Sequence, residues 1–137
     1  MQEADIPFVH EIEKICFDDP WSLASFKQQL ESDFAHYLIA YIDEKIVGYA
    51  CLWKFDDTGE IINFAVHPDF RGRGAGDALM HSCKEMCRQI QLEVRKSNKP
   101  AMLLYQKHGF TEIGIRKDYY KNPTEDAVIM NLGGENE

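Results

Sequence analysis

The sequence predicts an α/β domain whose sheet begins antiparallel, and two observations support this prediction. Strand-like and helical patterns follow one another in the order α-α-β-β-β-α-β-α-β-β, so short turns join the early strands and helices join the later ones. A glycine-rich segment, residues 71–76, lies between an apolar strand-like run and a helical pattern. A strand, a glycine loop and a helix start in this order are typical of α/β proteins that bind phosphate groups.

Length, composition and charge narrow the class of protein. The 137 residues, 45% of them hydrophobic, suffice for one domain, which we expect over residues 1–132 with a loose tail over 133–137. The formal net charge of −8 argues against nucleic acid as the main ligand, because neutralising phosphates requires a basic surface. No apolar run approaches the roughly 18 residues of a membrane span, and the acidic N-terminus is not a signal peptide. We therefore predict a cytoplasmic protein without membrane contact.

Two helices are expected before the first strand. Asp5 is the predicted cap of the first helix, with Pro7 in its first turn, and Pro20 ends that unit. Ser22 is the predicted cap of a short second helix. The expected apolar face of the first helix consists of Phe8, Val9, Ile12, Ile15 and Cys16.

The remaining elements follow from apolar periodicity and turn residues. Strands are predicted over residues 36–42, 45–55, 60–66, 90–95, 110–119 and 127–132, and helices over 75–88 and 98–108. A tight turn at Asp43 and Glu44 joins the first two strands, and Gly109 ends the last helix. The cysteines form no Cys-x-x-Cys pair, so Cys16, Cys51, Cys83 and Cys87 are predicted to be buried, reduced thiols.

The glycine loop is a predicted anion cradle. Alternate glycines leave backbone N–H groups open to a ligand, and the helix N-terminus adds partial positive charge. Asp77, directly after Gly76, excludes a Walker loop, which needs lysine there, and a dinucleotide fingerprint, which needs a third glycine. A tight strand-to-helix turn without a ligand is the alternative that the loop alone leaves open.

Further motifs extend almost from end to end of the chain. They are residues 3–7 (EADIP), 16–17 (CF), 20–22 (PWS), 46–50 (IVGYA), 63–68 (NFAVHP), 92–95 (LEVR), 97–98 (SN), 104–105 (LY), 109–110 (GF), 116–120 (RKDYY) and 125–127 (EDA). Arg71, Gly74 and Gly76 also fit Arg/Gln-x-x-Gly-x-Gly/Ala. With these motifs the chain resembles the RimI-type, ribosomal-protein-alanine branch of the GCN5-related N-acetyltransferase (GNAT) superfamily.

This resemblance implies a fold and a cosubstrate. The fold is the acyl-CoA N-acyltransferase fold, an α+β sandwich with a mixed, mostly antiparallel sheet, helices on both faces and a splayed central strand pair. Family members begin with a strand that is missing or truncated here, which leaves residues 36–42 at the sheet edge. The cosubstrate is acetyl-CoA, with no metal. By resemblance, the residues that bind it are Phe64, Ala65, Val66, Arg71, Gly72, Arg73, Gly74, Ala75, Gly76, Asn98 and Tyr105.

The resemblance also implies catalytic roles, each of which has a structural alternative. Glu93 matches the family's general base, Tyr105 its general acid, and the Val66 N–H is the expected oxyanion donor. By spacing alone, Glu93 could instead pair with Arg95 two residues along the same strand face. Tyr105 falls on an apolar helix stripe, which favours core packing, and Asn98 could be a helix cap.

The expected acceptor is a protein N-terminus, in this branch that of a basic ribosomal protein. By resemblance, the acceptor is bound by Phe17, Trp21, Tyr119 and Tyr120. A lysine or small-molecule amine acetyltransferase and a non-catalytic acyl-CoA-binding module are the alternatives, and the protein is expected to be a monomer or weak dimer.

Three further features bear on the site. Asp77 places a carboxylate beside the expected pyrophosphate. Arg71 and Glu93 stand closer in sequence than in the family, which shortens the helix end and the turn before the strand that carries Glu93. His67 and His108 are predicted to be structural, because neither belongs to a set of metal ligands with suitable spacing.

Overall fold

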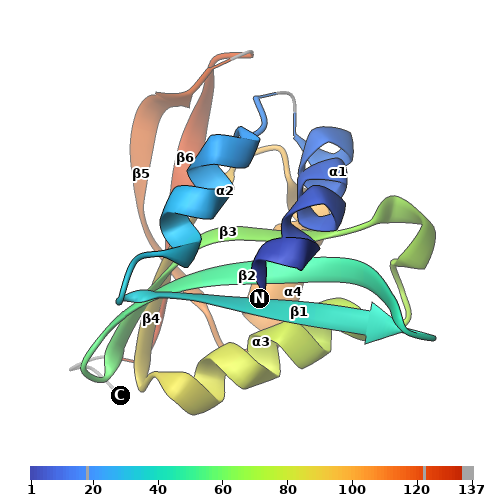
Figure 1. Ribbon diagram of the computed structural model, residues 1–137. Helices are drawn as coiled ribbons and strands as arrows, with labels where there is room; N and C mark the ends of the chain where they lie inside the picture. Colours follow the sequence, from blue (N-terminus) through green and yellow to red (C-terminus); the bar gives the residue numbers. More distant parts are fainter. Residues whose placement is uncertain (18, 122, 134–137) are drawn as a thin grey trace.

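The computed structural model describes residues 1–17, 19–121 and 123–133, in which one sheet lies between two layers of helices (Figure 1). The strands are β1 (Ala35–Ile42), β2 (Lys45–Phe55), β3 (Thr58–Val66), β4 (Gln89–Arg95), β5 (Thr111–Tyr120) and β6 (Glu125–Leu132). The helices are α1 (Ile6–Cys16), α2 (Leu23–Leu30), α3 (Ala75–Met86) and α4 (Lys99–Lys107), with single 3-10 turns η1 (Glu3–Asp5) and η2 (Pro68–Phe70). The predicted order of helices and strands is confirmed. Four of the five residues predicted to form the tail, 134–137, lie outside the described residues.

The sheet is mixed and mostly antiparallel, as expected. Its strand order is β1-β2-β3-β4-β6-β5, and only β3 and β4 pair in parallel among the described strands. Helices α1 and α2 cover one face, and α3 and α4 cover the other (Figure 1). In the described part of the chain no strand precedes α1, so β1 forms one edge of the sheet.

The central strands β3 and β4 separate partway along their length. They pair from Thr58 with Gln89 to Ile61 with Leu92, and no further. A β-bulge marks the point of separation, because Leu52 pairs with Ile61 whereas Cys51 pairs with Asn63, which leaves residue 62 as the extra residue. Beyond it, one edge of each strand is free of its neighbour, so a cleft opens between them.

The first helix buries Val9 and Ile12 of the predicted apolar face but not the whole of that face. Its buried residues are Ile6, Val9, Ile12 and Glu13. Phe8 and Ile15, which were expected in the apolar face, are 62% and 52% exposed. The prediction failed because it counted apolar residues, whereas the face against the sheet includes a charged one. Ser22 caps α2 as predicted, accepting a hydrogen bond from the Ser25 N–H at 3.1 Å.

Helix α3 ends at Met86, earlier than predicted, because the chain is already leading into β4. The N–H groups of Arg88 and Gln89 donate to the Asp57 carbonyl at 2.8 and 3.1 Å, just before β3 begins. This short connection still brings β4 into register with β3. All four cysteines are free; three are buried, and Cys16 is half-buried rather than buried.

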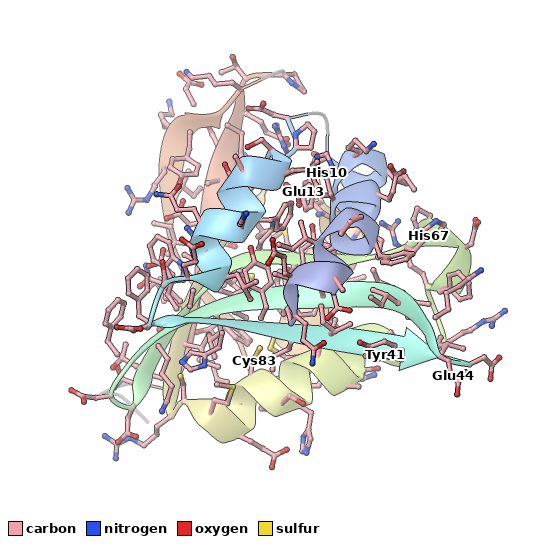
Figure 2. All side chains as sticks on the ribbon, viewed as in Figure 1. His10, Glu13, Tyr41, Glu44, His67 and Cys83 are labelled. Atoms are coloured by element: carbon pink, nitrogen blue, oxygen red, sulfur yellow. The ribbon has the colours of Figure 1, made fainter. Side chains whose placement is uncertain are left out.

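The tight turn between β1 and β2 is formed by two acidic residues in the left-handed region. Asp43 has φ 51° and Glu44 has φ 67°. Two consecutive positive φ values are typical of the two-residue turns that match the twist of a hairpin. Figure 2 shows Glu44 and Tyr41 near this end of β1, apart from the α1 residues His10 and Glu13.

Candidate active site

The glycine loop has the conformation of an anion cradle. Gly72 and Gly74 have φ 79° and 87°, values that disfavour other residues, and a Cβ on either glycine would meet nothing within 4 Å. Gly74 is the N-cap of α3, so Ala75 and Gly76 form the first turn of the helix. Backbone N–H groups of a helix start and the positive end of its dipole therefore face open space.

A cavity of about 540 Å³ lies beside this loop, and we call it the cofactor-side cavity. It is lined by Cys16, Phe17, Phe64, Ala65, Val66, Phe70, Arg71, Gly72, Gly74, Ala75, Gly76, Asp77, Asn98, Pro100, Ala101, Leu104, Tyr105 and Lys107. Ten of the eleven residues predicted to bind the cosubstrate are among them. The exception, Arg73, lies outside this lining and stacks over the Phe70 ring at 5.4 Å.

The end of β3 presents backbone groups to the cleft. The Val66 carbonyl accepts a hydrogen bond from Arg71 Nε at 3.1 Å and a longer one from the Cys16 thiol at 3.6 Å. The next N–H, that of His67, donates to the Val47 carbonyl of β2. Successive residues in a strand point their backbone groups to opposite sides, so the Val66 N–H also faces away from β2 and toward the cleft.

Asp77 does not face the loop as an unpaired charge. Its carboxylate contacts Lys107 Nζ at 3.1 Å and His108 Nε2 at 2.8 Å, which joins the start of α3 to the end of α4. Hydrogen bonds from His108 and Lys107 hold the pKa of Asp77 below its usual range. The residues around the cavity thus fit a pyrophosphate-bearing ligand, because the cradle is open and the nearby Asp77 carboxylate is paired with the Lys107 ammonium group.

His67 and His108, which were predicted to be structural, both make contacts that hold the local structure together. His108 pairs with Asp77, and His67 caps η2 by accepting the Asp69 N–H at 3.1 Å. Asn98 caps α4, accepting the Ala101 N–H at 3.3 Å, and it also lines the cavity. The cap and a ligand-facing position therefore coexist at Asn98.

A second cavity of about 480 Å³, the acceptor-side cavity, adjoins the first. It is lined by Glu13, Cys16, Phe17, Asp19, Trp21, Ile61, Ile62, Asn63, Phe64, Leu92, Glu93, Val94, Arg95, Asn98, Tyr105, Tyr119, Tyr120 and Lys121. The lining includes all four residues predicted to bind the acceptor. The two cavities share Cys16, Phe17, Phe64, Asn98 and Tyr105. The predicted base and acid therefore both line the acceptor-side cavity, and the acid also borders the other.

Glu93 points away from the side of β4 that packs in the α3 and α4 core. Its side chain is 13% exposed, and Oε1 lies 3.1 Å from Arg116 Nε. Its Oε2 is buried and has no hydrogen-bond partner among the described residues. Arg95 instead pairs with Glu125 at 3.3 Å and donates to the Lys121 carbonyl at 2.7 Å. The alternative of a Glu93–Arg95 ion pair is therefore wrong.

Tyr105 is both a core residue and a cavity residue. It is 6% exposed, and its ring meets the edges or faces of Phe64 and Phe110, each at 5.9 Å between ring centroids. Burial raises the pKa of Tyr105 above its ordinary value. The phenol consequently keeps its proton at neutral pH.

The paired tyrosines of β5 form the far wall of the acceptor-side cavity. The rings of Tyr119 and Tyr120 meet at 83°, with centroids 5.1 Å apart. Arg116 lies over Tyr119 at 5.7 Å and Arg95 over Tyr120 at 4.6 Å. Burial, and then the nearby Glu93 carboxylate, raise the pKa of Tyr120 to about 12, so the hydroxyl stays neutral beside the carboxylate.

Three residues of this region were not singled out from the sequence. Arg116 contacts the predicted base, and Glu13 and Asn63 are the buried polar residues of the described chain. The sequence did indicate that Glu13 could be buried, because Glu13 stands four residues after Val9 and so lies on the same face of α1. Asn63 is a polar residue within an apolar strand, a pattern that indicates a bulge or a buried polar network. Arg116 comes from a distant strand, and spacing offered no signal for it.

Comparison with known proteins agrees with this geometry. The sequence model of the Acetyltransferase (GNAT) family matches residues 6–110. The chain is 43% identical to the putative [ribosomal protein bS18]-alanine N-acetyltransferase of Bacillus subtilis, over 95% of this chain and 90% of that protein. It is 34% identical to the N-alpha-acetyltransferase RimI of Mycobacterium tuberculosis, over 95% and 87%.

A solved structure shares the fold. The crystal structure of the ribosomal-protein-S18-alanine N-acetyltransferase from Escherichia coli superposes with a TM-score of 0.86 and 31% identity, covering 100% of this chain and 95% of that one. The splayed strands, the glycine cradle and these similarities lead to one conclusion. The chain belongs to the acetyltransferase (GNAT) family, whose members use acetyl-CoA, and it is an N-acetyltransferase.

Proposed function

We propose that this enzyme acetylates the N-terminal α-amine of a protein, with the N-terminal alanine of a small-subunit ribosomal protein as the leading candidate. The observation that carries the proposal is the meeting of two cavities at Phe64 and Tyr105, with Glu93 in the lining of only one of them. One cavity has the phosphate-binding loop and the other has an aromatic wall. Such an arrangement suits two substrates that approach from opposite sides. The relatives named for this reaction support the choice of acceptor.

Acetyl-CoA would be held in the cofactor-side cavity and would supply the acetyl group as an activated thioester. Residues 71–76 would receive its pyrophosphate on their N–H groups, with Arg71 and Lys107 adding positive charge. The backbone of Phe64 and Val66 faces away from β2 and would bind the extended pantetheine arm in the manner of an added strand. The Phe64 N–H already donates to Asn63 Oδ1 at 3.0 Å, which leaves the Phe64 carbonyl and the Val66 N–H as the groups for this role. The Arg71 side chain donates a hydrogen bond to the Val66 carbonyl in this structure. That bond would have to break before the pantetheine arm could bond to the same carbonyl.

Glu93 is the proposed general base. Its Oε1 lies 3.1 Å from Arg116 Nε, a contact that would hold the carboxylate in a fixed orientation. The second carboxylate oxygen, Oε2, has no partner among the described residues, but it is buried, so neighbouring side chains would have to move before it could accept a proton from the incoming amine. Tyr105 is the proposed acid, because it holds its proton at neutral pH and borders both cavities.

The acidity of the acceptor amine fits a single carboxylate base. An α-amine has a pKa near 7.8, so roughly a tenth of it is uncharged at neutral pH, whereas a lysine side chain near 10.4 has less than about a thousandth uncharged. Removing a proton from an α-ammonium therefore demands less of Glu93. The wall formed by Tyr119 and Tyr120 on one side and Phe17 and Trp21 on the other would enclose the first residues of the peptide.

The proposal is tested by mass spectrometry of peptides incubated with the full chain and acetyl-CoA. The panel pairs an Ala-starting peptide carrying one internal lysine with the same peptide blocked at its N-terminus. We expect a single acetyl group on the α-amine of the first and none on the second. Acetylation of the blocked peptide would favour a lysine acetyltransferase instead. Binding of acetyl-CoA without transfer to any amine would favour a non-catalytic module and contradict the proposal.

A further inference from the structure

Glu13 is a carboxylate buried where α1 packs against the sheet. It is only 2% exposed, and Figure 2 labels it beside His10 in the helix that covers this face. Removing a carboxylate from water costs several kcal/mol unless hydrogen bonds replace the lost hydration. A charge in this position therefore requires specific partners.

The partners of Glu13 come from three different segments. Oε1 accepts hydrogen bonds from the Tyr49 hydroxyl of β2 and from Asn63 Nδ2 of β3, the latter at 2.8 Å. Oε2 accepts the backbone N–H of Trp21 at 2.8 Å, in the connection from α1 to α2. One carboxylate thus joins the helix to two central strands and to a loop.

Two of these contacts, those with Trp21 and Asn63, lead to the acceptor side of the site. Trp21 belongs to the loop of residues 17 and 19–22, which we call the acceptor-side loop, and Phe17, Asp19 and Trp21 of this loop line the acceptor-side cavity. Asn63 follows the bulge at which β3 leaves β4, and its Oδ1 accepts the Phe64 N–H at 3.0 Å. Glu13 itself is part of the same lining.

Glu13 and Glu93 have different surroundings in this cavity. Both oxygens of Glu13 already accept hydrogen bonds, three in all, whereas Oε2 of Glu93 accepts none among the described residues. A carboxylate with its oxygens engaged in this way is suited to holding other groups in place rather than to moving protons. The difference separates a structural anchor from a candidate base.

We propose that Glu13 is a positioning residue that anchors the acceptor-side loop to the β3 bulge and so determines how tightly the acceptor peptide binds. This inference rests on the proposed function, since it concerns the peptide half of the same site. The Trp21 side chain packs on Phe26 at 5.5 Å, but the Trp21 N–H bond is the link that fixes the backbone of the loop to the sheet through Glu13. Loosening that bond shifts one wall of the acceptor-side cavity and leaves residues 71–76 in place.

The test compares Glu13→Gln with the wild-type chain in steady-state kinetics and in acetyl-CoA binding. The amide has one acceptor oxygen and turns an NH₂ toward donors, so at least one of the three hydrogen bonds is lost. We expect the KM for the acceptor peptide to rise about tenfold, in line with the loss of a buried hydrogen bond to a charge. The kcat is expected to change less than about twofold. The Kd for acetyl-CoA is expected to change far less than the peptide KM, because only Phe17 of the acceptor-side loop also borders the cofactor-side cavity, and general destabilisation does not produce such a split.

Tyr37→Phe is the matched control. The Tyr37 hydroxyl is buried in the same layer, and it has no hydrogen-bond partner in the described part of the chain. Its removal takes a buried polar group out of the same layer without touching the acceptor-side loop, so the peptide KM should stay at the wild-type value. If Glu13→Gln does not fold, Glu13→Asp keeps the charge but shortens the reach, and the same rise in KM is expected.

Hydrogen exchange gives a readout that does not depend on activity. The amides of Phe17, Asp19, Trp21 and Ser22 should exchange faster in Glu13→Gln than in the wild type, while those of residues 71–76 keep their rates. Unchanged exchange together with an unchanged KM would overturn the role of Glu13 and leave the proposed function intact. A wild-type chain that acetylates no α-amine would instead overturn the proposed function, and the exchange experiment would still decide the role of Glu13.

Discussion

The two residues proposed to transfer protons, Glu93 and Tyr105, come from opposite faces of the sheet. Leu92 and Val94 of β4 pack in the same core as Tyr105, so Glu93 between them points to the opposite face, toward α1 and the acceptor-side loop. Tyr105 comes from α4 on the other face and reaches both cavities. The proposed base thus lies on the acceptor side, and the proposed acid lies where a departing thiolate would be protonated.

This division predicts different effects for two conservative substitutions. Glu93→Gln removes the proton acceptor but keeps the shape, so kcat should fall by about 10²- to 10⁴-fold with little change in acetyl-CoA affinity. Tyr105→Phe removes the donor and should also lower kcat, while the ring still packs on Phe64. Steady-state kinetics and calorimetric titration with acetyl-CoA check both expectations. Near-normal turnover by both variants would show that the roles are assigned to the wrong residues.

At this scale the sequence led to the residues proposed to react but not to the residues that hold them in place. Glu93 and Tyr105 stood in motifs that could be matched by resemblance. The contact of Arg116 with Glu93 depends on the antiparallel pairing of β4, β6 and β5, which spacing along the chain does not reveal. Glu13 was missed for another reason: a charge on an apolar stripe is usually solvated, and only the three donors around it explain its burial.

Elements create the cavities in which these residues stand. The bulge at residue 62 and the limited pairing of β3 with β4 open the cleft, and the glycine loop with the start of α3 forms its phosphate end. Gly76 brings the two helices of this face close together, since a Cβ there would stand 3.2 Å from a methyl group of Leu104. The cofactor-side cavity is therefore bounded by elements whose relative positions depend on small residues.

A substitution at Gly74 tests the loop as an element. Gly74→Ala introduces no clash, because a Cβ would meet nothing within 4 Å, so its whole effect comes from the φ of 87°. We expect a loss of about 1 kcal/mol in unfolding free energy and a weaker affinity for acetyl-CoA as the loop relaxes. Gly114→Ala is the control, since its Cβ would make an ordinary 3.6 Å contact with Ile129. Thermal unfolding with and without acetyl-CoA separates the two effects, and equal acetyl-CoA affinity in both variants would contradict the role of the loop.

Periodicity and turn residues predicted the elements well, with errors at their ends. The β2 bounds were predicted to the residue, because polar turns flank that apolar run on both sides. Helix α3 was predicted too long, since nothing in its own sequence shows that the Asp57 carbonyl already binds Arg88 and Gln89. The expected splay came from resemblance alone, and the bulge that accompanies it requires the register of two strands.

The molecule as a whole carries a net charge of −8, although the lining of the acceptor-side cavity is mixed, with Glu13, Asp19 and Glu93 beside Arg95 and Lys121. An acidic molecule attracts a basic peptide and repels an acidic one over distances of about a Debye length. The charge therefore adds to the selection made by contacts within the cavity. It fits a basic ribosomal protein as the proposed acceptor.

The charge predicts a salt-dependent preference between peptides with the same first residues. An Ala-starting peptide with lysines further along should have a higher kcat/KM than one with glutamates at those positions. The ratio of the two values should shrink toward one when the ionic strength rises from about 0.05 to about 0.5 M, because salt screens exposed charges. This ratio of kcat/KM values is measured from initial rates at a fixed acetyl-CoA concentration. A ratio that does not respond to salt would mean that net charge does not contribute to peptide choice.

The tight turn between β1 and β2 could be redesigned to make the fold more stable. Asp43 and Glu44 both adopt positive φ. In this conformation a residue with a side chain, such as Glu44, lowers the free energy of unfolding by roughly 1 kcal/mol relative to glycine. An Asn-Gly pair at these two positions would satisfy the preference of the turn. Because neither residue lines either cavity, the fold could gain this free energy without a change in turnover. A chain stabilised in this way could then tolerate costly substitutions made elsewhere to alter its choice of acceptor.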